Sequence, residues 1–525
     1  MSGILSNILL AVIVVALVVS AAHAQTFSLL YDFGNVSGDP EQPYLSGIVA
    51  QGRDGNLYTT SAVGGANGVG CVFNITPGGN LTVLSNFGAI GAFMASGLTL
   101  GTDGNLYGGS FKITPKGTLT PYSFAGSNDA PPIQGTGGNF YGTTTGGGSG
   151  YGTVYKLTQS GTQTTLYVFD STHGANPYAP LVQGTDGNLY GTTALGGANN
   201  YGTVFKLSTS GKFTLLYSFD GVHGQNPYSP LTQGADGYLY GTTSKGGSGN
   251  GVVFKISSSG VMTTLHSFDY LADGGFPYGG LIQASDGNFY GQASQGGSRG
   301  YGTIYEISPA GAFAVLYLFD RTTGQFPTVT LTQHTNGLLY GDATGGGSST
   351  QCGNDGCGTF YSLNAGLPPF IRLLPIQGRV GNAVEILGQG FTGTTSVSFN
   401  GTAAKFKAMS DTYLIATVPR GASTGAVSVS TPGGTLTSNQ NFRVAPTITS
   451  FSPASGPAGT PIVITGVSLT QTTKITIGGV LATNFSVNSD TQVTATVPTK
   501  AKTGKIMITT AGGMATSGAT FTVTP

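Results

Sequence analysis

A segment of about 50 residues repeats along the first two thirds of the chain, and this period constrains the fold more than any other feature. Residues 181–193 and 231–243 differ only at Thr232, Ala235 and Tyr238. A repeat of this length indicates a solenoid, a propeller or an array of small units. An Asp-Gly corner or its equivalent recurs at spacings of 49, 34, 49, 50, 50 and 50 residues, beginning at Asp54, Asp103, Gly137, Asp186, Asp236, Asp286 and Asn336.

One repeat contains four short segments with the residue types of β-strands, at residues 180–184, 189–193, 203–207 and 213–219. A tight hairpin is expected at residues 186–188, because glycine and asparagine tolerate positive φ. Helices are not expected: no window has an apolar period of 3.6 residues, and 89 of the 525 residues are glycine.

Antiparallel four-stranded units with this period favour a β-propeller. A parallel β-helix is the alternative, although its coils do not use two-residue hairpin corners. Counting the first three strands of each unit gives seven sets, of which the second is short at residues 106–113 and the third is degenerate at Gly137-Gly138. The sequence therefore predicts an all-β chain that begins with a seven-bladed β-propeller.

The two ends of the repeat region predict how the ring closes. Residues 27–33 have the residue pattern of the fourth strand of a repeat, but the first three strands of that repeat do not precede them. Residues 358–363 have the pattern of a third strand, and no fourth strand of the same pattern follows. We therefore expect the first segment to complete the last blade, which would protect both edges of the ring from aggregation.

The recurring motif also resembles a known family. Residues 186–193, 201–207 and 215–220, which read DGNLYGTT, YGTVFKL and LLYSFD, are similar to the GloVer tandem-repeat family of exported bacterial proteins. The resemblance covers residues 27–364. It implies an exported chain with variable anchoring or accessory modules at its C-terminus. The short second unit and the missing Asp at Gly137 depart from the pattern.

The repeat ends before a linker at residues 365–369, and two shorter related units follow. Residues 446–466 closely resemble the opening of TIG/IPT immunoglobulin-like modules. Alternating β-branched residues at short spacing suit a β-sandwich. We predict the propeller at residues 25–364 and TIG/IPT-like sandwiches at 370–444 and 445–525, which the resemblance implies are spacers or surface-adhesion units.

The N-terminus indicates export. Ile8–Val19 is an unbroken apolar run, and Ala22-His23-Ala24 fits a signal-peptidase site. Residues 1–24 are therefore predicted to be a signal peptide, with an uncleaved N-terminal anchor as the alternative. No other segment is apolar enough to span a bilayer. The mature chain is expected to be a monomer outside the cytoplasm: extracellular, on the cell surface or periplasmic.

The charge composition argues against nucleic acid as a partner. The 20 basic and 20 acidic side chains cancel, and charged residues make up only 8% of the chain. Phosphate binding requires clustered Lys and Arg.

The three cysteines give one predicted crosslink. Cys352 and Cys357 flank a flexible tip and are predicted to form a disulfide, which would stabilise the fold by about 2 kcal/mol. A metal site is the weaker interpretation, because no third or fourth ligand is close in sequence. Cys71 is expected to be a buried free thiol.

Four tyrosines are the candidate binding residues. Each follows a proline in a loop between blades, where its ring could stack on a sugar or pack between blades. They are Tyr44, Tyr178, Tyr228 and Tyr278.

Glutamines recur three residues before most corners, with Leu100 replacing the second. They could form a polar ring around the central channel, or bond to each other and to the backbone. They are Gln51, Gln134, Gln183, Gln233, Gln283 and Gln333.

Carboxylates also recur at the strand ends. Asp170, Asp220, Asp269 and Asp320 each follow the last Phe of a fourth strand and are expected to form Asx turns. A shared Ca2+ role is the alternative. No cofactor and no other metal is expected.

The sequence predicts a non-catalytic extracellular or cell-surface scaffold that contacts glycans or proteins through the propeller loops. No hydrolase, metalloprotease, phosphate-loop or EF-hand motif is present. The alternative is a secreted propeller enzyme, a lyase or hydrolase acting on polysaccharide. Its active site should appear as charge that breaks the repeat, and the candidates are Glu41, Glu306 and Asp342.

Overall fold

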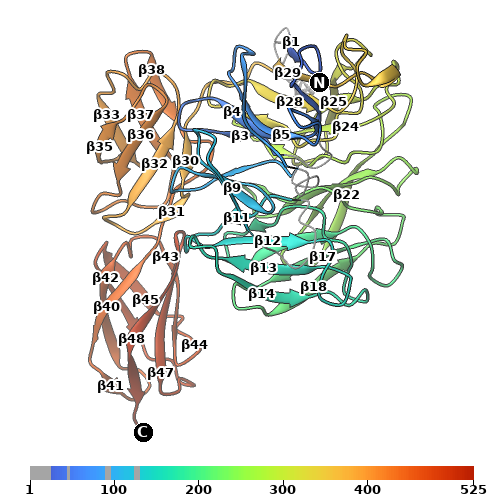
Figure 1. Ribbon diagram of the computed structural model, residues 1–525. Helices are drawn as coiled ribbons and strands as arrows, with labels where there is room; N and C mark the ends of the chain where they lie inside the picture. The colour runs from blue at the N-terminus through green and yellow to red at the C-terminus, as the bar shows by residue number, and fades with distance from the viewer. Residues whose placement is uncertain (1–24, 44–47, 89–95, 123–129) are drawn as a thin grey trace, which may run out of the picture.

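The computed structural model describes residues 25–43, 48–88, 96–122 and 130–525. These residues form strands and one short 3-10 helix, η1 (Gly353–Asp355). Figure 1 shows the repeat region as one body, with two smaller sandwiches along one side of it. None of the helical segments in these ranges could cross a bilayer. The predicted signal peptide and Tyr44 lie outside the described residues.

The repeats fold into seven antiparallel sheets, each with the strand order expected of a propeller blade, and this confirms the predicted fold class. Blade 4 shows the pattern: β15 (Val182–Gln183), β16 (Leu189–Thr193), β17 (Thr203–Leu207) and β18 (Phe213–Ser218) lie side by side in that order. The innermost strand has two residues, fewer than expected.

The other blades repeat this arrangement, with an extra pairing of β2 to β4 in blade 1. Their strands are β2 (Pro40–Pro43), β3 (Ala50–Gln51), β4 (Leu57–Gly64), β5 (Cys71–Ile75) and β6 (Leu81–Asn86) in blade 1; β7 (Thr99–Leu100), β8 (Leu106–Tyr107), β9 (Phe111–Ile113) and β10 (Leu119–Pro121) in blade 2; β11 (Ile133–Gln134), β12 (Phe140–Thr144), β13 (Thr153–Leu157) and β14 (Gln163–Val168) in blade 3; β19 (Thr232–Gln233), β20 (Leu239–Thr243), β21 (Val252–Ile256) and β22 (Met262–Ser267) in blade 5; β23 (Ile282–Gln283), β24 (Phe289–Ala293), β25 (Thr303–Ile307) and β26 (Phe313–Leu318) in blade 6; β27 (Thr332–Gln333), β28 (Leu339–Ala343), β29 (Thr359–Asn364) and β1 (Thr26–Asp32) in blade 7.

The first strand closes the ring as predicted. Strand β1 lies beside β29 (Figure 1) and pairs antiparallel with it. In this pairing Phe27 is opposite Leu363 and Asp32 is opposite Thr359. Blades 7 and 1 also join at the axis, where Thr332 Oγ1 donates a 2.7 Å hydrogen bond to Val49 O. The last blade therefore contains both ends of the repeat region.

The Asp-Gly corners are turns, as expected, and each is anchored by its aspartate. In blade 4, Asp186 Oδ1 accepts a hydrogen bond from Asn188 N at 3.1 Å, and Asp186 Oδ2 accepts one from the Tyr190 hydroxyl at 2.8 Å. Gly187 has φ +81°, a conformation that glycine adopts without strain. The corner therefore fixes the buried Tyr190 ring.

The hydrophobic core lies between neighbouring blades. Phe205 and Phe219 of one blade are fully buried, as is Phe254 of the next. The Phe219 and Phe254 rings contact edge to face, with centroids 5.5 Å apart. Burial of each such ring stabilises the fold by about 2 kcal/mol, so each blade depends on its neighbour.

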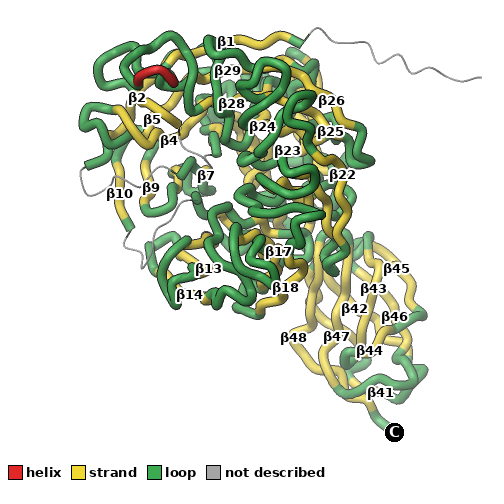
Figure 2. Tube along the Cα trace, turned by 90° about the vertical axis from the view of Figure 1, so that its right-hand side faces the viewer, coloured by secondary structure: helices red, strands yellow, loops and turns green. Residues whose placement is uncertain are grey.

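Each C-terminal unit is a sandwich of two packed sheets with its own buried core. The first sandwich has the sheets β30-β32-β36-β35 and β34-β33-β37-β38, together with the pair β31-β39; the second has β40-β42-β46-β45 and β41-β48-β47-β43-β44. The second sandwich projects away from the propeller and carries the C-terminus (Figure 2). The strands are β30 (Arg372–Leu374), β31 (Gln377–Gly378), β32 (Ala383–Leu387), β33 (Ser396–Phe399), β34 (Thr402–Ala403), β35 (Lys405–Ala408), β36 (Tyr413–Thr417), β37 (Val427–Thr431), β38 (Gly434–Thr437) and β39 (Arg443–Val444), then β40 (Thr447–Ser452), β41 (Ser455–Gly456), β42 (Pro461–Val467), β43 (Thr472–Ile477), β44 (Val480–Leu481), β45 (Phe485–Ser489), β46 (Gln492–Thr496), β47 (Gly504–Thr510) and β48 (Gly513–Val523).

The first sandwich docks on the propeller face that carries the Asp-Gly corners, which we name the corner face. Arg53 of blade 1 forms a two-pronged ion pair with Glu385 of the sandwich, with N–O distances of 2.6 and 2.9 Å. Arg443 donates a 2.7 Å hydrogen bond to Thr185 O of blade 4. The opposite face of the propeller is not contacted by these residues and is the candidate binding face. It is formed by the loops between the second and third strands of each blade and by the loops between blades. We name it the loop face.

Candidate binding surfaces

Proline-glycine contacts between blades hold the loop face in shape. Pro227 packs against Gly202 of the preceding blade, where a Cβ atom would lie 2.7 Å from Pro227 Cδ. Gly202 also has φ +93°, so a side chain there would strain the backbone. The same contact joins Pro277 to Gly251. Because the proline is fixed, the tyrosine that follows it is fixed too.

Three of the four predicted tyrosines form a ladder across blades 4, 5 and 6. The ring centroids of Tyr178 and Tyr228 are 5.4 Å apart, and those of Tyr228 and Tyr278 are 5.5 Å apart. All three are half-buried. We name these three residues the tyrosine ladder; it ends at blade 7, where Thr328 takes the equivalent position.

The hydroxyls of Tyr228 and Tyr278 make no hydrogen bond with any described residue. Burial raises the pKa of both phenols, and Tyr228 raises that of Tyr278 further. Both groups are therefore neutral at pH 7, with hydroxyls that can donate and accept hydrogen bonds.

The aspartates at the ends of the fourth strands form turns, as expected. Asp170 Oδ1 accepts a 2.9 Å hydrogen bond from His173 N, and Asp220 Oδ1 accepts one of 2.8 Å from His223 N. The backbone N–H of His173 and its ring lower the pKa of Asp170, although burial acts in the opposite direction. The carboxylates thus hold their own loops in place.

The recurring glutamines join neighbouring blades through the backbone, as one of the two interpretations predicted. Gln233 Oε1 accepts a 2.8 Å hydrogen bond from Thr185 N of the preceding blade, and its Nε2 donates to Gly237 O of its own corner at 3.2 Å. Gln51 and Thr335 make the corresponding contact across the closing seam. The same acceptor role holds for Gln134, Gln183, Gln283 and Gln333.

The series of glutamines is interrupted at Leu100, and an arginine spans the gap. Arg53 Nη2 of blade 1 donates a 3.0 Å hydrogen bond to Thr102 O of blade 2. Glu385 of the first sandwich pairs with the same guanidinium. The sandwich thus supports the one seam that lacks the glutamine.

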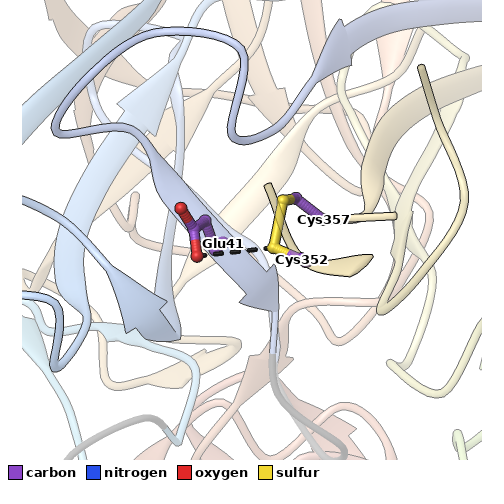
Figure 3. Close-up of side chains that lie close together, drawn as sticks. All are labelled: Glu41, Cys352 and Cys357. Atoms are coloured by element: carbon purple, nitrogen blue, oxygen red, sulfur yellow. Dashed lines mark hydrogen bonds between the residues drawn. A yellow bond between two sulfur atoms is a disulfide. The ribbon is translucent and has the colours of Figure 1, made fainter. Parts of the chain in front are cut away.

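The three acidic residues that depart from the repeat pattern, Glu41, Glu306 and Asp342, do not lie together in one site. Glu41 lies beside the disulfide that Cys352 and Cys357 form, with its Oε2 3.4 Å from Cys352 Sγ (Figure 3). In the described part of the chain, this is the one group of three potential metal-ligating side chains. Its sulfurs are bonded to each other, so neither is a thiolate ligand. Cys71 is buried and free, as expected, and burial raises its pKa to about 11.

The other two symmetry-breaking acids lie in blades 6 and 7. Glu306 is half-buried on β25 and accepts a 2.6 Å hydrogen bond from Asn288 of the neighbouring corner. Burial and the Asp286 charge raise the pKa of Glu306. Asp342 is fully buried, and neither of its oxygens has a hydrogen-bond partner. Burial raises the pKa of Asp342 to about 8, so this carboxyl is mostly protonated at pH 7.

Sequence comparison decides the family of the repeats. The Gloeobacter/Verrucomicrobia repeat matches residues 128–361 and 223–404, which together exceed half of the chain. The chain belongs to the Gloeobacter/Verrucomicrobia repeat family. The IPT/TIG domain matches residues 369–444 and 446–523. This repeat protein therefore carries two TIG domains after its propeller, as the resemblance implied. Among curated proteins, none matches it.

Solved structures resemble the repeat protein only distantly. A fungal alcohol oxidase of the AA5 family in complex with copper is 14% identical, with 96% of this chain and 100% of the oxidase covered and a TM-score of 0.43. The extracellular domain of a hybrid two-component system from B. thetaiotaomicron is 12% identical, with coverage of 93% and 64% and a TM-score of 0.43. The surface glycan-binding protein PbSGBP-B from Prevotella bryantii is 19% identical, with a TM-score of 0.23. That match covers 28% of this chain and 38% of the glycan-binding protein, so less than half of its length is spanned.

Two features of these surfaces have no counterpart in the sequence motifs. Phe326 of the loop face is 37% exposed and has φ +56°, a strained conformation for a bulky residue. Arg372 of the first sandwich lines a cavity on the propeller axis. A comparison of equivalent repeat positions could have found Phe326, where the fourth and fifth repeats have Asn176 and Asn226. Arg372 lies outside the repeats and gives no such signal.

Proposed function

We propose that the repeat protein is exported and that its loop face binds neutral glycans without catalysis, with the tyrosine ladder as the contact. Tyr178, Tyr228 and Tyr278 carry this proposal, because three half-buried rings on neighbouring blades form a continuous aromatic strip. Tyrosine rings combine an apolar face with a polar rim, and sugars present the same combination. Weak contacts on several blades would reinforce one another through effective concentration.

The position of the first sandwich supports this choice of face. It contacts the corners of blades 1, 4 and 7 through Arg53, Thr185 and Thr335. The ladder lies at the other end of the innermost strands. A ligand on the loop face would therefore not compete with the sandwich, which would act as a spacer or second contact.

The charges of the molecule support a neutral ligand. The chain has no net charge, and the carboxylates of Asp170 and Asp220 on the loop face are already bound to their own turns. A polysaccharide hydrolase would need paired acids near the substrate. Asp342 has the raised pKa of a general acid, but it is fully buried and so is out of reach of a polymer.

Export is part of the proposal and rests on the N-terminal segment and on the disulfide. Disulfides persist in oxidising compartments. N-terminal sequencing of the protein recovered from outside the cytoplasm should begin at Gln25. A chain that retains residues 1–24 would favour the uncleaved anchor.

The test is a binding screen of residues 25–525 against neutral polysaccharides and peptidoglycan. A triple variant, Tyr178→Ala, Tyr228→Ala and Tyr278→Ala, should lose binding about 100-fold if each stacking contact contributes about 1 kcal/mol. Tyr238→Ala is the matched control, because this tyrosine is 39% exposed at a corner. Unchanged binding by the triple variant would contradict the proposal. A lower melting temperature with no ligand found would assign the tyrosines to blade packing.

A further inference from the structure

The propeller axis holds a cavity of about 430 Å³ that all seven blades and the first sandwich line. Residues of the innermost strands form its wall, and Arg372, Leu373 and Ile376 of the sandwich close it on the corner face. The tyrosine ladder does not line it. Cavities of this size accept small ligands, so the axis is a second place where the protein could bind a molecule.

The wall of this axial cavity offers few groups for hydrogen bonding. Ile133, Val182 and Ile282 contribute aliphatic side chains. The threonines of the wall use their hydroxyls within the propeller: Thr232 Oγ1 donates to Leu281 O at 2.5 Å, and Thr332 Oγ1 donates to Val49 O at 2.7 Å. A sugar would lose hydrogen bonds to water without replacing them here, whereas a hydrocarbon chain would lose none.

Arg372 is the charged group that lines the cavity. Its Nη2 donates a 3.1 Å hydrogen bond to Gln333 O, which uses one of the five guanidinium donors. Among the described residues, no carboxylate forms an ion pair with it. Burial lowers the pKa of Arg372, but a guanidinium remains protonated in proteins. Arg372 is partly buried, and a partly buried cation without a counter-charge favours the binding of an anion.

His334, whose pKa Arg372 influences, does not supply that anion. His334 is fully buried, its Nε2 bonds to Gly55 O at 2.9 Å, and its Nδ1 accepts from Asn336 N. Burial lowers the pKa of His334, and Arg372 lowers it further. The imidazole is therefore neutral and supplies no counter-charge to Arg372.

We propose that the axial cavity binds an aliphatic carboxylate, with its carboxylate on Arg372 and its hydrocarbon chain along the wall formed by the innermost strands. Guanidinium and carboxylate match in a planar, two-pronged geometry. The exposed residue Gln440 also lines the cavity, so it has an outlet to solvent beside the first sandwich. This site is independent of the proposed glycan face, because it uses different residues and a different ligand chemistry.

The probes are octanoate, octan-1-ol and inorganic phosphate, titrated calorimetrically into residues 25–525. Octanoate should bind once per chain. Octan-1-ol, which lacks the charge, and phosphate, which lacks the chain, should each bind at least tenfold more weakly. Equal binding of octanoate and phosphate would overturn the role of the apolar wall, and equal binding of octanoate and octan-1-ol would overturn the role of Arg372.

Two variants locate the site. Arg372→Met should weaken octanoate binding at least tenfold, whereas Arg379→Met, an exposed arginine of the same sandwich, should not change it. Val182→Phe narrows the wall without touching Arg372 and should also weaken binding at least tenfold. Octanoate should raise the melting temperature of the unsubstituted protein and of Arg379→Met, but not of the other two. Unchanged octanoate binding in Val182→Phe overturns the proposal even if Arg372→Met does not fold.

Discussion

Replacing Asp342 by asparagine should stabilise the propeller above pH 7 and leave its stability unchanged near pH 4. Asp342 is fully buried in blade 7, and neither carboxyl oxygen has a hydrogen-bond partner. The equivalent Thr192 and Thr242 each donate to a backbone carbonyl of the next blade, at 3.1 and 3.0 Å. Segment 44–47, where the equivalent carbonyl of blade 1 falls, lies outside the described residues.

The size of the stability loss that Asp342 causes follows from its raised pKa. Burial takes the pKa of Asp342 from 3.8 to about 8 in the folded chain. Between these values the unfolded chain loses this proton and the folded chain keeps it. Each pH unit in this window then lowers the free energy of unfolding by about 1.4 kcal/mol. At pH 7 the loss relative to pH 4 is therefore about 4 kcal/mol, and it levels off above pH 8.

The assay is urea unfolding at several pH values between 4 and 9, followed by the near-ultraviolet circular dichroism of the buried tyrosines. The quantity of interest is the difference in unfolding free energy between Asp342→Asn and the unsubstituted chain. This difference should grow with pH through the whole window, and Asp342→Thr, which restores the repeat residue, should behave alike. Asp355→Asn is the control at an exposed position. A difference that does not depend on pH would refute the reasoning.

Three further predictions concern contacts that hold the assembly together. Gln233→Ala removes two hydrogen bonds at a blade seam and should lower the unfolding free energy by about 1–2 kcal/mol in urea denaturation; a neutral result would show that the seam does not depend on this amide. Arg53→Ala leaves Glu385 without its partner and should make the linker after the propeller more sensitive to limited proteolysis, and an unchanged cleavage rate would contradict this. Replacing Cys352 and Cys357 together by alanine should lower stability by about 2 kcal/mol, and an equal loss on reducing the native chain is the matching check.

Features that follow from local chemistry could be predicted from the sequence. The Asp-Gly corners, the seven blades and the pairing of residues 27–33 with the last blade all came from repeated residue patterns and their register. The innermost strand was predicted too long, because Pro180 and Leu181 lie before β15 and only two residues pair. The repeated pattern predicts that a strand runs through residues 180–184, but it does not determine how many of these residues pair with the next strand.

The arrangement of propeller and sandwich could not be predicted. Arg53 and Glu385 are 332 positions apart, and neither belongs to a repeated pattern. The substitution of Leu100 for glutamine was visible in the sequence. The role of Arg53 at this seam was not, because its ion-pair partner Glu385 lies in another domain. The role of Arg372 likewise depends on a contact between domains. The tyrosine ladder was predicted as separate residues, and only the structure shows that blades 4 to 6 place the rings side by side.

Hydroxyl-radical footprinting with and without a glycan from the screen tests the central claim most directly. Bound glycan should protect Tyr178, Tyr228 and Tyr278 from oxidation and leave Tyr238 of the corner face unchanged. Protection of Tyr238 instead, or unchanged oxidation of the ladder at saturating glycan, would contradict the assignment of the loop face as the binding surface.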